Sequence, residues 1–374
     1  MHYRGAYIVN RRNFLKTTAA TSAALTLSSA HSAVSAVPKE SKPKIMVWAH
    51  AHTDFLGDDN QVMAEFEKIR ESGIDIIYLF VHSHPDENQA WYNASINGFV
   101  AQDRLSRTIN FGKKAGVEIH PIIGGIKDIG LSEANRKKRS YVSGKPGGSS
   151  RDGRFCASWQ TTRLSSLRIA SDVINNHTIS GFHLDYIRYI DTGMGIKWPC
   201  QCDACKQNYE SFLGKKDIST IDLQNPGMLF HYLKVRNENI TDAVLQFKKL
   251  ANQNNLKISM AARADYFGSA LVEGQDWINW GHAGLFDYIC PMNYTTDRDE
   301  HRDLLKMQLS LMDGKAGIYS GLGRKWSAGE TKTDDMIKQA EDALNMGAAG
   351  ISIYHYHGLN DKDFAALKEF SKNI

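Results

Sequence analysis

GFHLDYIRY, residues 181–189, is the stretch that decides the fold. Phe182 and Leu184 are apolar, as in a short buried strand, and Asp185 and Arg188 follow where such a strand would end. A carboxylate followed closely by Tyr186 and Tyr189 suits a hydrophobic core poorly and a catalytic strand end well. In barrels of parallel strands, catalytic residues lie at the C-terminal strand ends. We therefore predict that Asp185 lies at a functional strand end.

Strand-like and helix-like segments alternate along the chain, which favours a parallel α/β architecture. Short apolar segments predict strands at 44–50, 75–82, 117–123, 179–185, 256–261, 286–291, 316–320 and 350–355. Amphipathic patterns predict helices at 60–72, 100–115, 160–175, 228–252, 274–281, 300–313, 333–346 and 361–372. This is the pattern of a closed (β/α)8 TIM barrel. The alternative is an open doubly wound sheet, but no Gly-rich phosphate loop follows the first strand.

Two strand-to-helix connections are long. Residues 124–159 follow the third strand and contain a basic run at 135–139. Residues 190–227 follow the fourth strand and hold three of the five cysteines. We expect both loops to project from the catalytic face, where long loops shape a substrate groove.

The stretch 181–189 resembles the fourth-strand signature of glycoside-hydrolase-like barrels, the family-10-like glycosyl hydrolases, which are distant relatives of the alpha-amylase clan. Residues 44–48, 73–78 and 287–294 resemble their first, second and sixth strands. The resemblance implies a TIM barrel that cleaves glycosidic bonds. In the clan the nucleophile follows a Gly-aromatic-basic-aliphatic run; here Asp185 does so, with His183 where Arg is expected.

Glycosidic cleavage needs two carboxyl groups that flank the scissile bond. Asp185 is the expected nucleophile or base, although Arg188 could instead hold it in a structural ion pair. The clan would place a Glu at the end of the fifth strand, where Asp265 is the nearest acid and no Glu precedes Glu273. We predict Asp265 as the second catalytic group. Other acids at predicted strand ends are Asp54, Asp86, Glu87, Asp128 and Asp297.

Aromatic, histidine and arginine side chains near the strand ends could bind a sugar, since aromatic rings stack on the apolar faces of sugars. Tryptophans in or just beyond the predicted loops are Trp91, Trp159, Trp198, Trp277, Trp280 and Trp326. For any single tryptophan, packing of its loop against a helix is the favoured interpretation, and six together favour at least one in a groove. The predicted substrate-binding residues are His84, His183, Tyr186, Arg188, Trp198, Arg263, Tyr294 and His355.

Four of the five cysteines form a candidate metal site. The three at Cys200, Cys202 and Cys205 lie too close in sequence to bridge one another without strain. With Cys156 they could hold a structural zinc ion, and similar clusters follow the fourth strand in proteins of the suspected family. A disulfide between Cys156 and one of the three is the alternative.

A second metal hypothesis starts from His50-Ala51-His52, which resembles the first-strand metal motif of the amidohydrolase barrels. That family also requires histidines after the fifth and sixth strands and an Asp after the eighth. The predicted strand ends here offer Arg263, Asn293 and His355 instead, so most of the ligands are missing. The histidines could rather bind sugar hydroxyl groups or transfer protons.

The first 36 residues read as a twin-arginine signal peptide. Arg11 and Arg12 open the motif, an apolar run follows at 17–30, and 34–36 reads as the cleavage site. The run is too short and polar for a stable membrane span. We expect one barrel domain at 37–374, exported by the twin-arginine translocase to the periplasm or beyond.

The net charge of +4 belongs to the signal, which has four basic and no acidic residues, so nothing global indicates nucleic acid.

Taken together, these features predict a hydrolase of poly- or oligosaccharides that needs no added cofactor. A polysaccharide lyase acting on uronates, a non-catalytic carbohydrate-binding barrel and a metal-dependent amidohydrolase are the alternatives.

Overall fold

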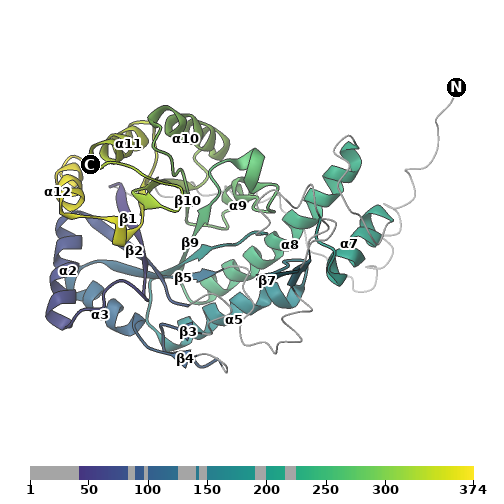
Figure 1. Ribbon diagram of the computed structural model, residues 1–374, viewed down its shortest axis with the longest axis horizontal. Coiled ribbons are helices and arrows are strands. Elements are labelled where there is room, and N and C mark those ends of the chain that lie inside the picture. Colours follow the sequence, from purple (N-terminus) through teal and green to yellow (C-terminus); the bar gives the residue numbers. More distant parts are fainter. Residues whose placement is uncertain are drawn as a thin grey trace, which may run out of the picture. The chain divides into compact units, whose positions relative to one another are not determined.

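The computed structural model describes residues 42–82, 89–96, 100–124, 140–142, 150–189, 199–214 and 225–374 (Figure 1). The predicted signal peptide lies outside these residues. So do two predicted substrate-binding residues, His84 and Trp198, and three of the candidate acids, Asp86, Glu87 and Asp128.

The described strands form a closed parallel barrel, which confirms the predicted TIM-barrel fold. In order around the barrel these are β1 (Lys44–His50), β2 (Ile74–Phe80), β5 (Glu118–Gly124), β8 (Gly181–Asp185), β9 (Lys257–Ala262), β10 (Tyr288–Pro291), β11 (Gly317–Gly323) and β14 (Gly350–Tyr354). The last strand pairs with the first, with Ile45 opposite Ile351. Observed and predicted strand ends differ by no more than three residues.

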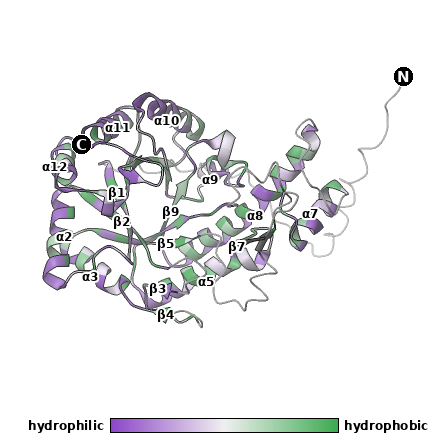
Figure 2. Cartoon of the chain, viewed as in Figure 1, coloured by the Kyte–Doolittle hydropathy of each residue, from purple (hydrophilic) through white to green (hydrophobic). Residues whose placement is uncertain are grey.

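Helices follow these strands and surround the barrel (Figure 1). They are α2 (Asp59–Glu71), α3 (Leu105–Ala115), α5 (Gln160–Asn176), α8 (Pro226–Gln253), α9 (Trp277–His282), α10 (Arg298–Met312), α11 (Thr333–Asn345) and α12 (Asp361–Ser371). Figure 2 shows their mixed hydropathy, as expected where one helix face packs on a sheet and the other meets water. Among the described residues, no helix is both long enough and apolar enough to cross a membrane.

Short helices and strands lie within the strand-to-helix connections. The two long connections contribute the antiparallel pair β6 (Ser140–Val142) and β7 (Ser150–Phe155), and the helix α7 (Asp203–Leu213). The remaining short elements are β3 (Gln89–Ala90), β4 (Val100–Ala101), η1 (Tyr266–Ala270), β12 (Lys325–Trp326), β13 (Gly329–Glu330) and η2 (Tyr356–Gly358). The sequence did not predict α7, because the whole of 190–227 read as a loop.

The core has two layers, as the alternation of side chains along a strand requires. On β1, Ile45 and Val47 pack between the strands and the helices, whereas Met46 and Trp48 fill the barrel interior. On β8, Phe182 and Leu184 belong to the outer layer. The same two-residue period turns the intervening side chains of β8 into the barrel.

Two tryptophans that were expected near loops belong to α9. Trp277 and Trp280 are buried there, at 0% and 2% exposure, in the layer between helices and strands. They stabilise the packing of α9, so they are not available to stack on a sugar.

Candidate active site

Asp185 is the carboxylate at the C-terminal mouth of the barrel. It ends β8, and its position in the strand period turns it to the inside, one layer above His183. Its side chain is buried but not sealed, with 11% of its surface exposed. Asp185 therefore lies where the catalytic residues of such barrels lie.

The loop after β8 fixes this carboxylate. Asp185 Oδ1 accepts a hydrogen bond from the Tyr186 backbone N–H at 2.6 Å and lies 3.4 Å from Arg188 Nη1. Tyr186 has a φ of 55°, in the left-handed region that bulky residues rarely adopt. Its ring lies over the Arg188 guanidinium, with 4.8 Å from Cζ to the ring centroid. Backbone strain of this kind concentrates at functional sites.

Two arginines and a second carboxylate complete the charged part of the site. Arg263, which follows β9, makes two hydrogen bonds to Glu273, from Nε at 2.8 Å and from Nη2 at 2.9 Å. Arg188 Nε lies 3.3 Å from the same carboxylate. Burial alone would lower the pKa of Arg263, but Glu273 outweighs burial and the pKa is raised. The site thus joins Asp185, Arg188, Glu273 and Arg263 in one network.

Aromatic rings form the apolar wall beside Asp185. Tyr294, after β10, and Tyr354, at the end of β14, stack with their ring centroids 5.2 Å apart. The Trp48 ring lies 6.2 Å from each of them. Burial, helped by the negative charge of Asp185, raises the pKa of Tyr294 well above its ordinary value. Both tyrosines therefore present neutral O–H groups and ring faces, which suits contact with a sugar.

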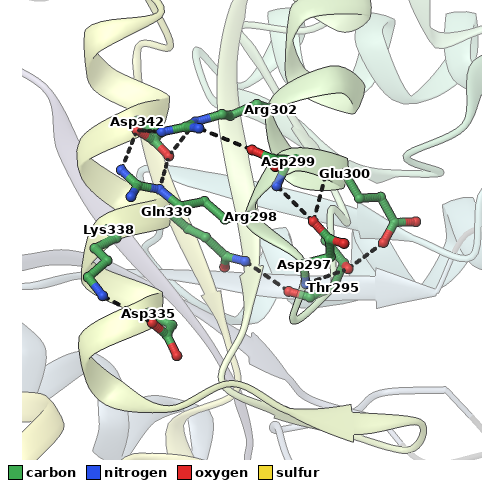
Figure 3. A network of polar contacts seen from close by, with 10 residues as sticks. All are labelled: Thr295, Asp297, Arg298, Asp299, Glu300, Arg302, Asp335, Lys338, Gln339 and Asp342. Carbon is green, nitrogen blue, oxygen red and sulfur yellow. Dashed lines mark hydrogen bonds and ion pairs between the residues drawn. The ribbon is translucent and has the colours of Figure 1, made fainter.

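A polar network holds the loop that carries Tyr294 (Figure 3). The Gln339 side chain on α11 donates to the Thr295 carbonyl oxygen at 2.9 Å. The Asp297 carboxylate caps α10 by accepting from two backbone N–H groups. Asp342 on α11 binds the guanidinium groups of Arg298 and Arg302 on α10. The β10–α10 loop is thus fixed to two helices.

His183 was predicted to contact substrate, and its burial contradicts this. The side chain is 0% exposed in the barrel interior. Its Nε2 accepts a hydrogen bond from Trp48 Nε1 at 3.1 Å, and its Nδ1 lies 2.8 Å from Ser259 Oγ. The ring stacks on Tyr78. Burial lowers the pKa of His183 well below its ordinary value, so it is a neutral support beneath the site. This position could have been predicted from the sequence. Side chains alternate along a strand, so the outward Phe182 and Leu184 place His183 inside the barrel.

Histidines gather where β1 and β14 lie side by side. The rings of His50 and His355 have centroids 5.6 Å apart, and His52 lies 5.4 Å from His50. Asp54 is buried, accepts the His50 backbone N–H at 2.7 Å and lies 3.6 Å from His357 Nδ1. Burial, with the neighbouring histidines, lowers the pKa of His50 to about 4.

This histidine group does not have the geometry of a metal site. Within the described chain, the cysteines form the one set of three or more ligand atoms close enough to share an ion. His355 instead extends the aromatic wall of the mouth, because its ring centroid lies 4.8 Å from that of Tyr354.

Other predicted residues fall into two groups. Asp185, Tyr186, Arg188 and Arg263 lie together, and Tyr294 joins them through the charge of Asp185. Asp265 is exposed, and its carboxylate caps η1 by accepting from the Gly268 backbone N–H at 2.9 Å. No role was predicted from the sequence for Glu273, Tyr354 or Trp48. The one sequence signal for Glu273 was that it is the first Glu after the predicted fifth strand.

The four clustered cysteines meet in space. Cys156 follows β7, and the other three lie at the start of α7: Cys200, Cys202 and Cys205. All four are buried free thiols whose sulfur atoms lie within 4.8 Å of one another. Four sulfurs around one zinc ion at about 2.3 Å require a set of similar size, so these residues fit a tetrahedral site.

The N-terminal residues match a family model, the TAT (twin-arginine translocation) pathway signal sequence, at residues 9–28. The protein is therefore exported by the twin-arginine route and is periplasmic or secreted. No curated protein sequence matches the chain.

Several solved structures share the fold. The PgaB (BpsB) glycoside hydrolase domain from Bordetella bronchiseptica has a TM-score of 0.67 and 14% identity, over 88% of this chain and 99% of that one. The beta-amylase catalytic domain from Paenibacillus polymyxa has a TM-score of 0.58 and 11% identity, over 87% and 97%. A GH18 chitinase from Pseudoalteromonas aurantia has a TM-score of 0.51 and 14% identity, over 88% and 100%. The chain is thus an exported TIM barrel whose structural neighbours are glycoside hydrolases.

Proposed function

We propose that this protein is an exported glycoside hydrolase that cleaves a poly- or oligosaccharide with Asp185 as nucleophile or base. The observation that carries the proposal is the placement of Asp185, an inward carboxylate at a strand end between aromatic rings and arginines. We further propose that residues 1–36 are the signal peptide and that 37–374 form one barrel domain.

The residues around Asp185 would each have a separate role in catalysis or substrate binding. Arg188, 3.4 Å from Asp185, would hold the carboxylate in place for attack on the sugar or on water. Tyr186, Tyr294 and His355 would bind sugar hydroxyl groups and ring faces in the mouth. No step requires an added cofactor, because hydrolysis needs only the two carboxyl groups and water.

Asp265 stays the proposed second carboxyl group, and its capping role allows a clean test. Asn caps helices as well as Asp does, so Asp265→Asn should keep the cap while removing the acid. We expect the variant to lose at least about a hundredfold in kcat at an unchanged thermal midpoint. Full activity in Asp265→Asn would remove Asp265 from the catalytic pair.

A polysaccharide lyase is the second candidate, favoured by the tyrosines beside Asp185. One screen distinguishes the candidates. The protein is incubated with a panel of polysaccharides, and new reducing ends are measured together with the ultraviolet absorbance of unsaturated uronates. Hydrolysis gives reducing ends without that absorbance, whereas a lyase gives both. If saccharides bind but no product forms, the protein is a non-catalytic carbohydrate-binding barrel.

We also propose that Cys156, Cys200, Cys202 and Cys205 hold a structural zinc ion that fixes α7 to the loop after β7. Protein purified from the cytoplasm without its signal should contain about one equivalent of zinc by elemental analysis. A chelator should expose the 199–214 segment to proteolysis first, because thiolate ligation couples metal binding to local folding. Metal-free protein with a disulfide to Cys156 would contradict the zinc site.

A further inference from the structure

Glu273 is a fully buried carboxylate beside the proposed catalytic residue. Its side chain is 1% exposed and lies between two guanidinium groups, those of Arg188 and Arg263. Its backbone carbonyl accepts a hydrogen bond from the Tyr189 N–H at 2.7 Å, which ties this segment to the loop after β8. A buried carboxylate is retained at such a position only when it is paired.

The four ionised groups of this network balance one another. Asp185 and Glu273 supply two negative charges, and Arg188 and Arg263 supply two positive charges. Arg188 is nearly sealed, with 6% of its side chain exposed and the Tyr186 ring over its face. Arg263 is more open at 30%, but its two-point pairing with Glu273 occupies Nε and Nη2.

A third arginine at this end of the barrel is paired as well. Arg324 follows β11, and its guanidinium lies 2.9 Å from Asp363 and 2.7 Å from Glu330. Each arginine that the structure places just beyond β8, β9 and β11 therefore already has a carboxylate partner. The carboxylate of a uronate substrate would therefore meet arginines that are already paired, and the negative charge of Asp185 would repel it.

We propose that Glu273 is a positioning residue that sets substrate class: by pairing both Arg188 and Arg263 it makes the subsite beside Asp185 accept an uncharged sugar ring and reject a uronate. This inference rests on the proposed function, because it assigns the substrate class of the same site. It also disfavours the lyase, which needs a free cation to neutralise the uronate carboxylate.

The test uses two small probes of equal size, methyl β-D-glucoside and methyl β-D-glucuronide, with binding measured by ligand-observed NMR. Wild-type protein should bind the glucoside more tightly than the glucuronide. Glu273→Gln keeps the shape but removes the negative charge paired with Arg263 and Arg188, so it should bind the glucuronide about five- to tenfold more tightly than wild type does. The double variant Glu273→Gln/Arg263→Gln has balanced charges again and should return to the wild-type ratio.

Two results would overturn the inference. One is wild-type protein that binds the glucuronide as tightly as the glucoside or more tightly; the other is a Glu273→Gln variant whose glucuronide binding stays at the wild-type level. A purely structural Glu273 would lower stability without changing the ratio of the two affinities. If Glu273→Gln does not fold, the wild-type preference still decides. The ratio does not depend on turnover, so failure of the proposed hydrolase would show separately, as a panel without new reducing ends.

Discussion

At the scale of single residues, Tyr186 joins backbone strain to the chemistry of the site. Its backbone N–H donates to Asp185, and its left-handed backbone directs its ring over Arg188. A left-handed conformation costs a bulky residue roughly 1–2 kcal/mol, which the surrounding structure must offset. We infer that this strain is retained because it holds the Tyr186 ring over Arg188, the ion-pair partner of Asp185.

Replacing Tyr186 separates strain from function. Glycine adopts positive φ readily, so Tyr186→Gly should leave the free energy of unfolding within about 1 kcal/mol of wild type. Loss of the ring over Arg188 should lower kcat/KM on a cleaved polysaccharide by about tenfold or more. Tyr186→Phe is the matched control and should retain most activity. Unchanged kcat/KM in the glycine variant would show that the ring has no role.

At the scale of elements, the contact between α10 and α11 holds the loop that carries Tyr294. Asp342 accepts hydrogen bonds from Arg298 and Arg302 (Figure 3). These arginines lower the pKa of Asp342 to about 2, and Arg298 has the larger effect. The nearby pair of Asp335 and Lys338 is half exposed on each side. The same helix therefore carries one ion pair with a buried carboxylate, at Asp342, and one with a half-exposed carboxylate, at Asp335.

The depressed pKa of Asp342 predicts how stability depends on pH. The folded pKa lies below the unfolded value near 3.9, so the contribution is present above about pH 4 and is lost as pH falls towards 2. Asp342→Asn should lower the free energy of unfolding by about 1 kcal/mol at pH 7, and this deficit should shrink between pH 4 and 2. Asp335→Asn, the exposed control, should change little. Chemical denaturation across this pH range measures both, and a pH-independent deficit would contradict the ion-pair account.

At the scale of the whole molecule, the fold could be predicted from the sequence because each barrel strand is a separate short apolar run. The period of 3.6 or 2 residues then assigned nearly every barrel element. Asp185 was found for the same reason, since the run 181–185 ends in it. The partners of Asp185 were harder to predict, because Glu273, Tyr354 and Trp48 come from distant segments that only barrel closure brings together. Their identity depends on three-dimensional contacts that one-dimensional spacing does not encode.

The measurement that tests the central claim most directly is the activity of Asp185→Asn on a polysaccharide that the wild-type protein cleaves. Removing the carboxylate removes stabilisation of the transition state rather than packing, so kcat should fall by at least about a thousandfold. The thermal midpoint should stay nearly unchanged, because Asn can still accept the Tyr186 N–H. Wild-type turnover in Asp185→Asn, or a large fall in midpoint that accounts for the lost activity, would contradict the assignment of Asp185 as the catalytic carboxylate.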